Sequence, residues 1–163
     1  MPNWCSVEIK IDGDMKQVVP LVSGNDSNGE HKDVTFNVLI PMPEDIYRGS
    51  LGTEERKIYG KNNWYDWSCS NWGTKWDAVD GVIRDNTIMF DTAWNDPYEW
   101  LLVFAEKLGE LNISAQVNCF TEGMSVEDGL SGYFIDEGTL YDDEADEEFT
   151  KAYMEMYEEE DEE

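Results

Sequence analysis

Near the start of the chain stand the residues Trp4-Cys5-Ser6-Val7-Glu8-Ile9-Lys10-Ile11-Asp12. Apolar and polar side chains alternate along this stretch, so the apolar ones fall on one face and the polar ones on the other. A period of two residues is typical of a β-strand that is buried on one side only. We therefore expect a sheet with one face packed against the rest of the chain.

The segments after this strand alternate between strand and helix patterns. The clearest helix starts around Asp96, since Asp is a good N-cap, Pro97 suits the first helical position and Glu99 completes a capping box. Gly109 fits the position just after the last turn, where this helix is expected to end. This order favours an α+β domain with helices on one face of a mainly antiparallel sheet. The other expected elements are a helix over 15–22, strands over 34–40, 78–84, 87–92, 113–119 and 132–140, and a turn at Asp85-Asn86.

Composition suits one folded domain, because 40% of the 163 residues are hydrophobic and 13% are aromatic. The chain has 37 Asp and Glu against 11 Lys and Arg, a net charge of −26. This charge argues against direct binding of nucleic acid or of anionic membranes, both of which require cations. With no long apolar run and no secretory signal pattern, we expect a cytoplasmic protein whose cysteines, Cys5, Cys69 and Cys119, are reduced.

Acidic residues concentrate at the C-terminal end. From Glu122 to Glu163 there are eighteen acids and one base, Lys151. Apolar residues recur within this segment at helical spacing, which predicts an amphipathic helix near 141–159, docked by its apolar stripe and offering carboxylates outward. The residues of the expected stripe are Ala145, Phe149, Ala152, Tyr153 and Met156.

The expected domain organisation has two parts. Residues 1–140 form the α+β body, with a Trp-rich insertion near 44–76. Residues 141–163 form the acidic helix and a frayed tail.

Four motifs occur in a fixed order along the body, and together they resemble the YubB-type ferredoxin-like domain family of phage and plasmid proteins over about residues 2–125. The resemblance implies a ferredoxin-like antiparallel sheet with helices on one face, and a mobile-element protein that works in a bacterial host. It implies no known reaction. One departure is Asn95-Asp96-Pro97, where the family pattern has two prolines after Trp94. The motifs are Pro2-Asn3-Trp4-Cys5, Phe36-Asn37 followed by Pro41-Met42-Pro43, Asn71-Trp72-Gly73-Thr74-Lys75-Trp76-Asp77-Ala78, and Phe90-Asp91-Thr92-Ala93-Trp94 followed by Pro97.

No residue pattern indicates catalysis, a metal or a cofactor. The three cysteines form no C-x-x-C pair, and the single histidine, His31, stands in a polar loop without a nucleophile pattern. No phosphate-binding loop or dinucleotide fingerprint is present. We expect a protein that is not an enzyme and holds no metal or cofactor. A carboxylate-dependent enzyme stays open as an alternative, which requires a concave site with converging acids of raised pKa.

The acidic segment has a charge density comparable to that of DNA. Duplex DNA presents one charge per about 1.7 Å of axis, and the chain holds fifteen acids between Asp136 and Glu163. Carboxylates at that density can replace phosphates in a cationic groove. Together with the resemblance, this predicts an inhibitor of a host nucleic-acid-binding defence complex, a CRISPR effector or a restriction enzyme. An acidic face that only keeps the protein soluble stays open. The expected partner-binding residues are Asp142, Asp143, Glu144, Asp146, Glu147, Glu148, Glu155 and Glu158.

The Trp-rich insertion offers a different interaction site. Trp64, Tyr65 and Trp67 either form a small core of their own or anchor a protein partner, because such residues are favoured at binding hot spots. Near-complete burial of the three rings would exclude the second interpretation. The sequence indicates no oligomeric state.

Overall fold

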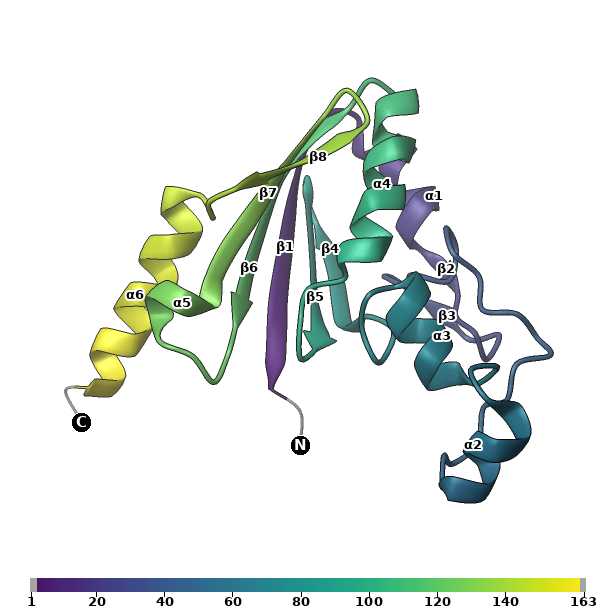
Figure 1. Ribbon diagram of the computed structural model, residues 1–163. Coiled ribbons are helices and arrows are strands. Elements are labelled where there is room, and N and C mark those ends of the chain that lie inside the picture. Colours follow the sequence, from purple (N-terminus) through teal and green to yellow (C-terminus); the bar gives the residue numbers. More distant parts are fainter. Residues whose placement is uncertain (1–2, 162–163) are drawn as a thin grey trace.

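The computed structural model describes residues 3–161, with side chains as far as residue 157. A six-stranded sheet forms the centre, and helices lie on both of its faces (Figure 1). In chain order the elements are β1 (Trp4–Asp12), α1 (Met15–Val22), β2 (Gly24–Asn25), β3 (His31–Lys32), α2 (Thr53–Tyr59), α3 (Trp64–Asn71), β4 (Val79–Arg84), β5 (Thr87–Ala93), α4 (Tyr98–Glu110), β6 (Ser114–Thr121), α5 (Val126–Gly129), β7 (Leu130–Asp136), β8 (Thr139–Asp143) and α6 (Glu147–Asp161).

The strand order β4-β5-β1-β6-β7-β8 places β1 inside the sheet, and all neighbouring strands are antiparallel. Ile9 of β1 lies opposite Ile88 of β5 and Val117 of β6. This register aligns the apolar side chains of three strands on one face. The expected α+β class and antiparallel sheet are confirmed, as is the β4–β5 hairpin that turns at Asp85-Asn86.

Helices α1 and α4 cover the apolar face (Figure 1). Val18 and Val22 of α1 are completely buried, as are Leu101, Phe104 and Leu108 of α4. Burial of an aliphatic or aromatic side chain contributes about 1.5–3 kcal/mol. The contact between these two helices and the sheet is therefore the main core of the protein.

The start of α4 differs from the expected cap. Pro97 occupies the N-cap position without a side-chain hydrogen bond. The Asp96 carboxylate instead accepts a hydrogen bond of 2.5 Å from the Tyr133 hydroxyl of β7. The prediction that Asp96 caps the helix is wrong because this long-range partner takes its carboxylate.

Two expected strands take other forms. Residues 34–40 make bends and turns, since Asp77 accepts hydrogen bonds from the Phe36 amide (2.7 Å) and the Thr35 hydroxyl (2.5 Å). Residues 132–140 span parts of two strands, β7 and β8. Glu137 and Gly138 both adopt positive φ, 49° and 79°, which is the backbone conformation of a two-residue hairpin turn.

The chain between β3 and β4 lies outside the sheet and includes α2 and α3, with α3 beside α4 (Figure 1). Trp72 fixes this insertion to the body. Its ring is buried and packs 5.9 Å from Phe36, and its indole N–H donates to the Ile40 carbonyl oxygen at 2.9 Å.

Helix α6 lies on the face of the sheet opposite α1 and α4 (Figure 1). The expectation of helices on one face only is therefore corrected. The reason is Phe120 of β6, which points away from the main core and gives α6 an apolar anchor. Within residues 3–161, no helix is both long enough and apolar enough to cross a bilayer.

Candidate functional site

Aromatic rings fix α6 to the sheet. Tyr153 stacks on Phe120 with ring centroids 4.4 Å apart, and Tyr157 lies 5.6 Å from the same ring. Phe149 lies 4.8 Å from Tyr153 and is only 7% exposed. The helix thus presents a fixed outer face.

The docked stripe differs in part from the expected one. Phe149, Tyr153 and Tyr157 form a row at four-residue spacing against the sheet, whereas Ala152 and Met156 are exposed. Met156 has 50% of its surface in solvent. The helical period alone does not show which of two adjacent rows meets Phe120, because both rows contain apolar residues.

Asp146 holds the start of α6. Its carboxylate accepts hydrogen bonds from the Phe149 amide (2.9 Å) and from Asn118 Nδ2 (3.0 Å), and it lies 2.8 Å from Lys10 Nζ. Desolvation pushes the pKa of Asp146 upward, but these hydrogen bonds outweigh it and hold the pKa below its ordinary value. The Asp146 carboxylate is therefore occupied within the protein.

Three of the other predicted partner-binding acids lie on α6 and are exposed: Glu147, Glu148 and Glu155. Glu148 lies 3.2 Å from Lys10 Nζ, yet 88% of its side chain is in solvent. Glu158 is also within α6, but its side chain lies outside the described residues.

The remaining three acids precede the helix, and the expected helix start near residue 141 is wrong. Asp142 and Asp143 end strand β8, opposite Tyr133 and Gly132 respectively. Successive strand side chains point to opposite faces, so Asp142 lies on the α4 side and Asp143 on the α6 side. We call five exposed carboxylates, of α6 and of the residues shortly before it, the acidic surface; they are Asp143, Glu144, Glu147, Glu148 and Glu155.

The three predicted aromatic anchors are half-buried in the insertion. Trp67 packs 5.0 Å from Trp72, and the Trp64 indole N–H donates to the Gly49 carbonyl oxygen at 2.9 Å. Tyr65 lies 5.9 Å from Trp64. These rings serve the packing of their own domain, and each still has surface in solvent, so the aromatic interpretation stays open.

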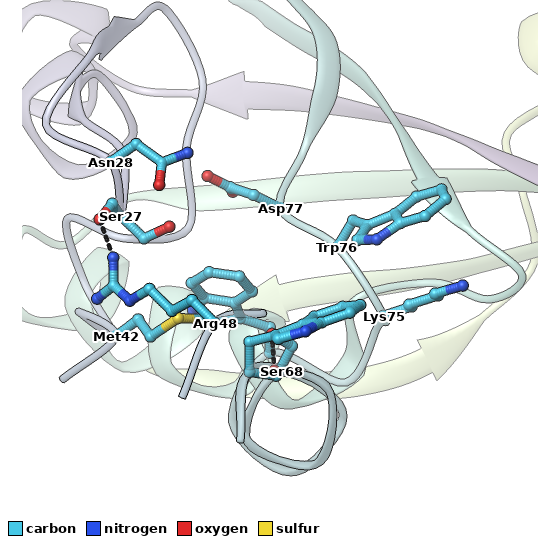
Figure 2. Close-up of a pocket in the computed structure, with 10 residues that line it drawn as sticks. Ser27, Asn28, Met42, Arg48, Ser68, Lys75, Trp76 and Asp77 are labelled. Atoms are coloured by element: carbon cyan, nitrogen blue, oxygen red, sulfur yellow. Dashed lines mark hydrogen bonds between the residues drawn. The ribbon is translucent and has the colours of Figure 1, made fainter. Parts of the chain in front are cut away.

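A cavity of about 170 Å³ opens in the insertion (Figure 2). Figure 2 shows Asn28, Ser27 and Arg48 on one side of the space and Trp76 on the other, while the Lys75 ammonium points away. Lys75 Nζ instead lies 4.6 Å over the Trp76 ring. The full lining is Ser27, Asn28, Met42, Arg48, Trp64, Ser68, Trp72, Lys75, Trp76 and Asp77.

Sequence reasoning missed this cavity. Its walls come from the β2–β3 turn, the loop around Met42 and Arg48, and the segment from Trp64 to Asp77, which no periodic pattern brings together. The sequence feature that could have indicated the cavity is the block Trp72-Gly73-Thr74-Lys75-Trp76-Asp77. That block joins a buried anchor, Trp72, to a half-buried ring, Trp76.

A second cavity, of about 230 Å³, lies between α6 and the sheet and is lined in part by Glu8, Asp80 and Asp91. Burial raises the pKa of Asp91, and the neighbouring Asp80 adds to the effect while Ser6 opposes it. The carboxylate-enzyme alternative thus has one carboxyl group of raised pKa in a concave site. Among the described residues, no group of three or more metal-ligating side chains is placed to hold an ion.

Comparison of the chain with family models, with curated proteins and with solved structures finds no match. The features of the molecule that bear on function are therefore its fold, the acidic surface and the two cavities.

Proposed function

We propose that this protein binds and inhibits a nucleic-acid-binding defence protein of a bacterial host, a CRISPR effector or a restriction enzyme, by presenting its acidic surface in place of DNA. The observation that carries the proposal is the docking of α6 through Phe149, Tyr153 and the Asp146–Lys10 pair. A flexible acidic tail loses conformational freedom when it binds, whereas a docked helix has already lost it. Docking therefore favours recognition over mere solubilisation.

The amount of charge also supports mimicry. Helix α6 has fifteen residues, about 22 Å at the usual helical rise, a length over which duplex DNA presents roughly 13 charges. The chain places eleven acids and one base between Asp142 and Asp161. A cationic groove built for a phosphate backbone can therefore find a comparable number of carboxylates, although their spacing differs from that of phosphates.

We also propose that the core of the domain has the ferredoxin-like topology. The chain order β1-α1-β4-β5-α4-β6, with β4-β5-β1-β6 adjacent in the sheet, supports a ferredoxin-like core to which β7, β8 and α6 are added. A phage or plasmid origin and a place in the host cytoplasm rest on the motif resemblance.

The proposal is tested by affinity capture from a bacterial lysate at low and high salt, followed by a DNA-cleavage assay on the captured enzyme. We expect a nuclease or effector complex whose capture weakens with salt and is competed by duplex DNA, because the contacts are ionic. Its cleavage of DNA should fall when the protein is added. Capture that resists both salt and DNA would instead favour a partner bound through Trp64, Tyr65 and Trp67.

A matched pair of variants separates position from total charge. Neutralising four acids of the acidic surface should abolish inhibition, whereas neutralising four exposed acids elsewhere should preserve it. Equal inhibition by the two variants would contradict the proposal. The surface variant is Asp143→Asn, Glu144→Gln, Glu147→Gln and Glu155→Gln, and the control is Glu30→Gln, Glu44→Gln, Glu54→Gln and Glu106→Gln.

A further inference from the structure

The insertion cavity has a chemistry unlike the rest of this acidic protein. Three indole rings line it, those of Trp64, Trp72 and Trp76, and an arginine stands at its edge. Among the described residues, no carboxylate oxygen lies within 4.0 Å of the Arg48 guanidinium. An aromatic space beside an arginine without a carboxylate partner favours a ligand that has both a ring and a negative charge.

The size of the cavity limits the ring. A volume of about 170 Å³ is close to the roughly 150 Å³ of an apolar cavity that accepts one benzene molecule. The space therefore suits a single ring system. Indole faces favour stacking with such a ring, as aromatic side chains do with nucleic-acid bases.

Arg48 keeps donors for an anion. Its guanidinium donates to the carbonyl oxygens of Ser27 and Pro43, which ties the β2–β3 turn to the loop after Met42. A guanidinium has five N–H donors. Within the described part of the chain these two bonds use two of them, so three are available to a ligand. Charge-assisted bonds from arginine to phosphate oxygens are among the strongest in proteins.

The nearby carboxylate does not repel an anion strongly, because it is already compensated. Asp77 accepts hydrogen bonds from the amides of Phe36 (2.7 Å) and Ala78 (2.8 Å) and lies 3.6 Å from Lys32 Nζ. The acidic surface is also remote, since α6 and α3 stand at opposite sides of the molecule (Figure 1). Charges separated by more than about 8 Å are largely screened at physiological salt.

Asn28 further limits the class of ligand that the cavity can bind. Its side chain is exposed and stands on the same side of the space as Arg48 (Figure 2). Its backbone N–H donates to Asp26, and its side-chain amide makes no hydrogen bond to another described residue. An amide presents a donor and an acceptor side by side, which matches the edge of a nucleobase.

We propose that this cavity binds a nucleoside monophosphate, with the base against the indole rings and Asn28 and the phosphate on Arg48. This site is separate from the acidic surface and does not depend on the inhibitory function. It also differs from binding of a nucleic-acid polymer, because the cavity accepts one ring system and the surrounding chain is strongly acidic.

Isothermal titration of the full-length protein tests the proposal, with the four ribonucleoside monophosphates, their nucleosides, inorganic phosphate and benzoate as ligands. We expect at least one monophosphate to bind with a dissociation constant below about 1 mM, and its nucleoside to bind roughly tenfold more weakly, since a charge-assisted hydrogen bond contributes about 1.5–3 kcal/mol. Failure of all four monophosphates to bind would overturn the proposal. Binding of phosphate or benzoate as tightly as the best monophosphate would also overturn it.

Two variants locate the binding. Arg48→Lys keeps the charge but loses the planar fork, and it should weaken monophosphate binding roughly tenfold while leaving the nucleoside unaffected. The matched control is Arg84→Lys, at an exposed position of β4, which should change nothing. Trp76→Leu should weaken the nucleoside and the monophosphate alike. Unchanged binding in the Arg48 and Trp76 variants would place the ligand elsewhere and contradict the proposal.

Discussion

Lys10 lies close to three carboxylates and connects two elements of this acidic chain. Its ammonium lies 2.8 Å from Asp146, 3.2 Å from Glu148 and 3.6 Å from Glu8. Desolvation lowers the pKa of Lys10, but its hydrogen bonds to Asp146 and Glu148 outweigh this effect and raise the pKa well above its ordinary range. The ammonium thus joins β1 in the sheet to the start of α6.

Replacing this lysine should weaken the attachment of α6. For Lys10→Gln we expect a loss of about 1 kcal/mol in the free energy of unfolding and a melting temperature lower by about 2–4 °C, because the ion pairs are partly exposed. Thermal unfolding followed by circular dichroism measures the change. Lys16→Gln on α1, where the side chain is exposed, is the control and should leave the melting temperature unchanged. An equal shift in both variants would contradict the role of Lys10.

Asp96 is a half-buried acid whose charged form is disfavoured in the folded protein, whereas the charged form of Lys10 is favoured. Burial raises its pKa, and the hydrogen bond from Tyr133 offsets this only in part. The folded state therefore holds the Asp96 proton more strongly than the unfolded state does. This contribution to stability is lost as the pH rises from the ordinary value of about 3.9 through the folded-state pKa.

Asp96→Asn should remove that pH dependence while keeping an oxygen acceptor for Tyr133. We expect the variant to be more stable than the wild type near pH 7, with the advantage shrinking as the pH falls toward the ordinary pKa of Asp, about 3.9. Urea unfolding at several pH values gives the difference. Asp12→Asn, at an exposed position, is the control. A variant that is less stable across the whole range would show that the carboxylate itself is needed.

Helix α6 makes few contacts with the rest of the protein, whereas neighbouring strands of the sheet make many with one another. Phe149→Ala removes a nearly buried ring, a change that costs about 3–5 kcal/mol in protein cores. We expect α6 to detach while the sheet stays folded. Hydrogen exchange should then show lost protection over residues 147–157 and unchanged protection in β1 and β6.

Met156→Ala is the control for α6, since Met156 is 50% exposed on the same helix. It should change stability by less than about 0.5 kcal/mol. If Phe149→Ala instead unfolds the whole protein, α6 belongs to the cooperative core and is not an added element.

The elements that the sequence predicts well are those with a local cause. The period-two pattern of β1 and the Asp85-Asn86 turn both lie within a few residues of what they specify. The expected helix over 15–22 also has a local cause in the structure, because the Asp14 carboxylate accepts a hydrogen bond from the Lys16 amide. The errors have long-range causes, such as Tyr133 taking the Asp96 carboxylate and Asp77 bending the chain at Phe36. The candidate sites follow the same rule, because the number of acids is visible in the sequence whereas the row of α6 that meets Phe120 is not.

Across the whole molecule, like-charge repulsion between acids is widespread, whereas ion pairs are few. The net charge is −26, whereas the ion pairs among the described residues involve four cations, Lys10, Lys32, Arg56 and Lys107. Self-repulsion of this magnitude destabilises a compact state, and salt screens it. Salt also weakens the Lys10–Asp146 attraction, but that is one partly exposed network worth about 1 kcal/mol.

Repulsion should therefore dominate the response to salt. We expect the melting temperature to rise by several degrees as sodium chloride increases from about 10 mM to 150 mM, a range over which the Debye length falls from roughly 30 Å to 8 Å. The four-site variant of the acidic surface should show a smaller rise, because it starts with less charge beside α6. The control with four neutralised acids elsewhere has the same net charge, so a difference between the two variants measures the local repulsion around α6. A melting temperature that falls with salt would mean that ion pairs outweigh the excess of acids and would contradict this account.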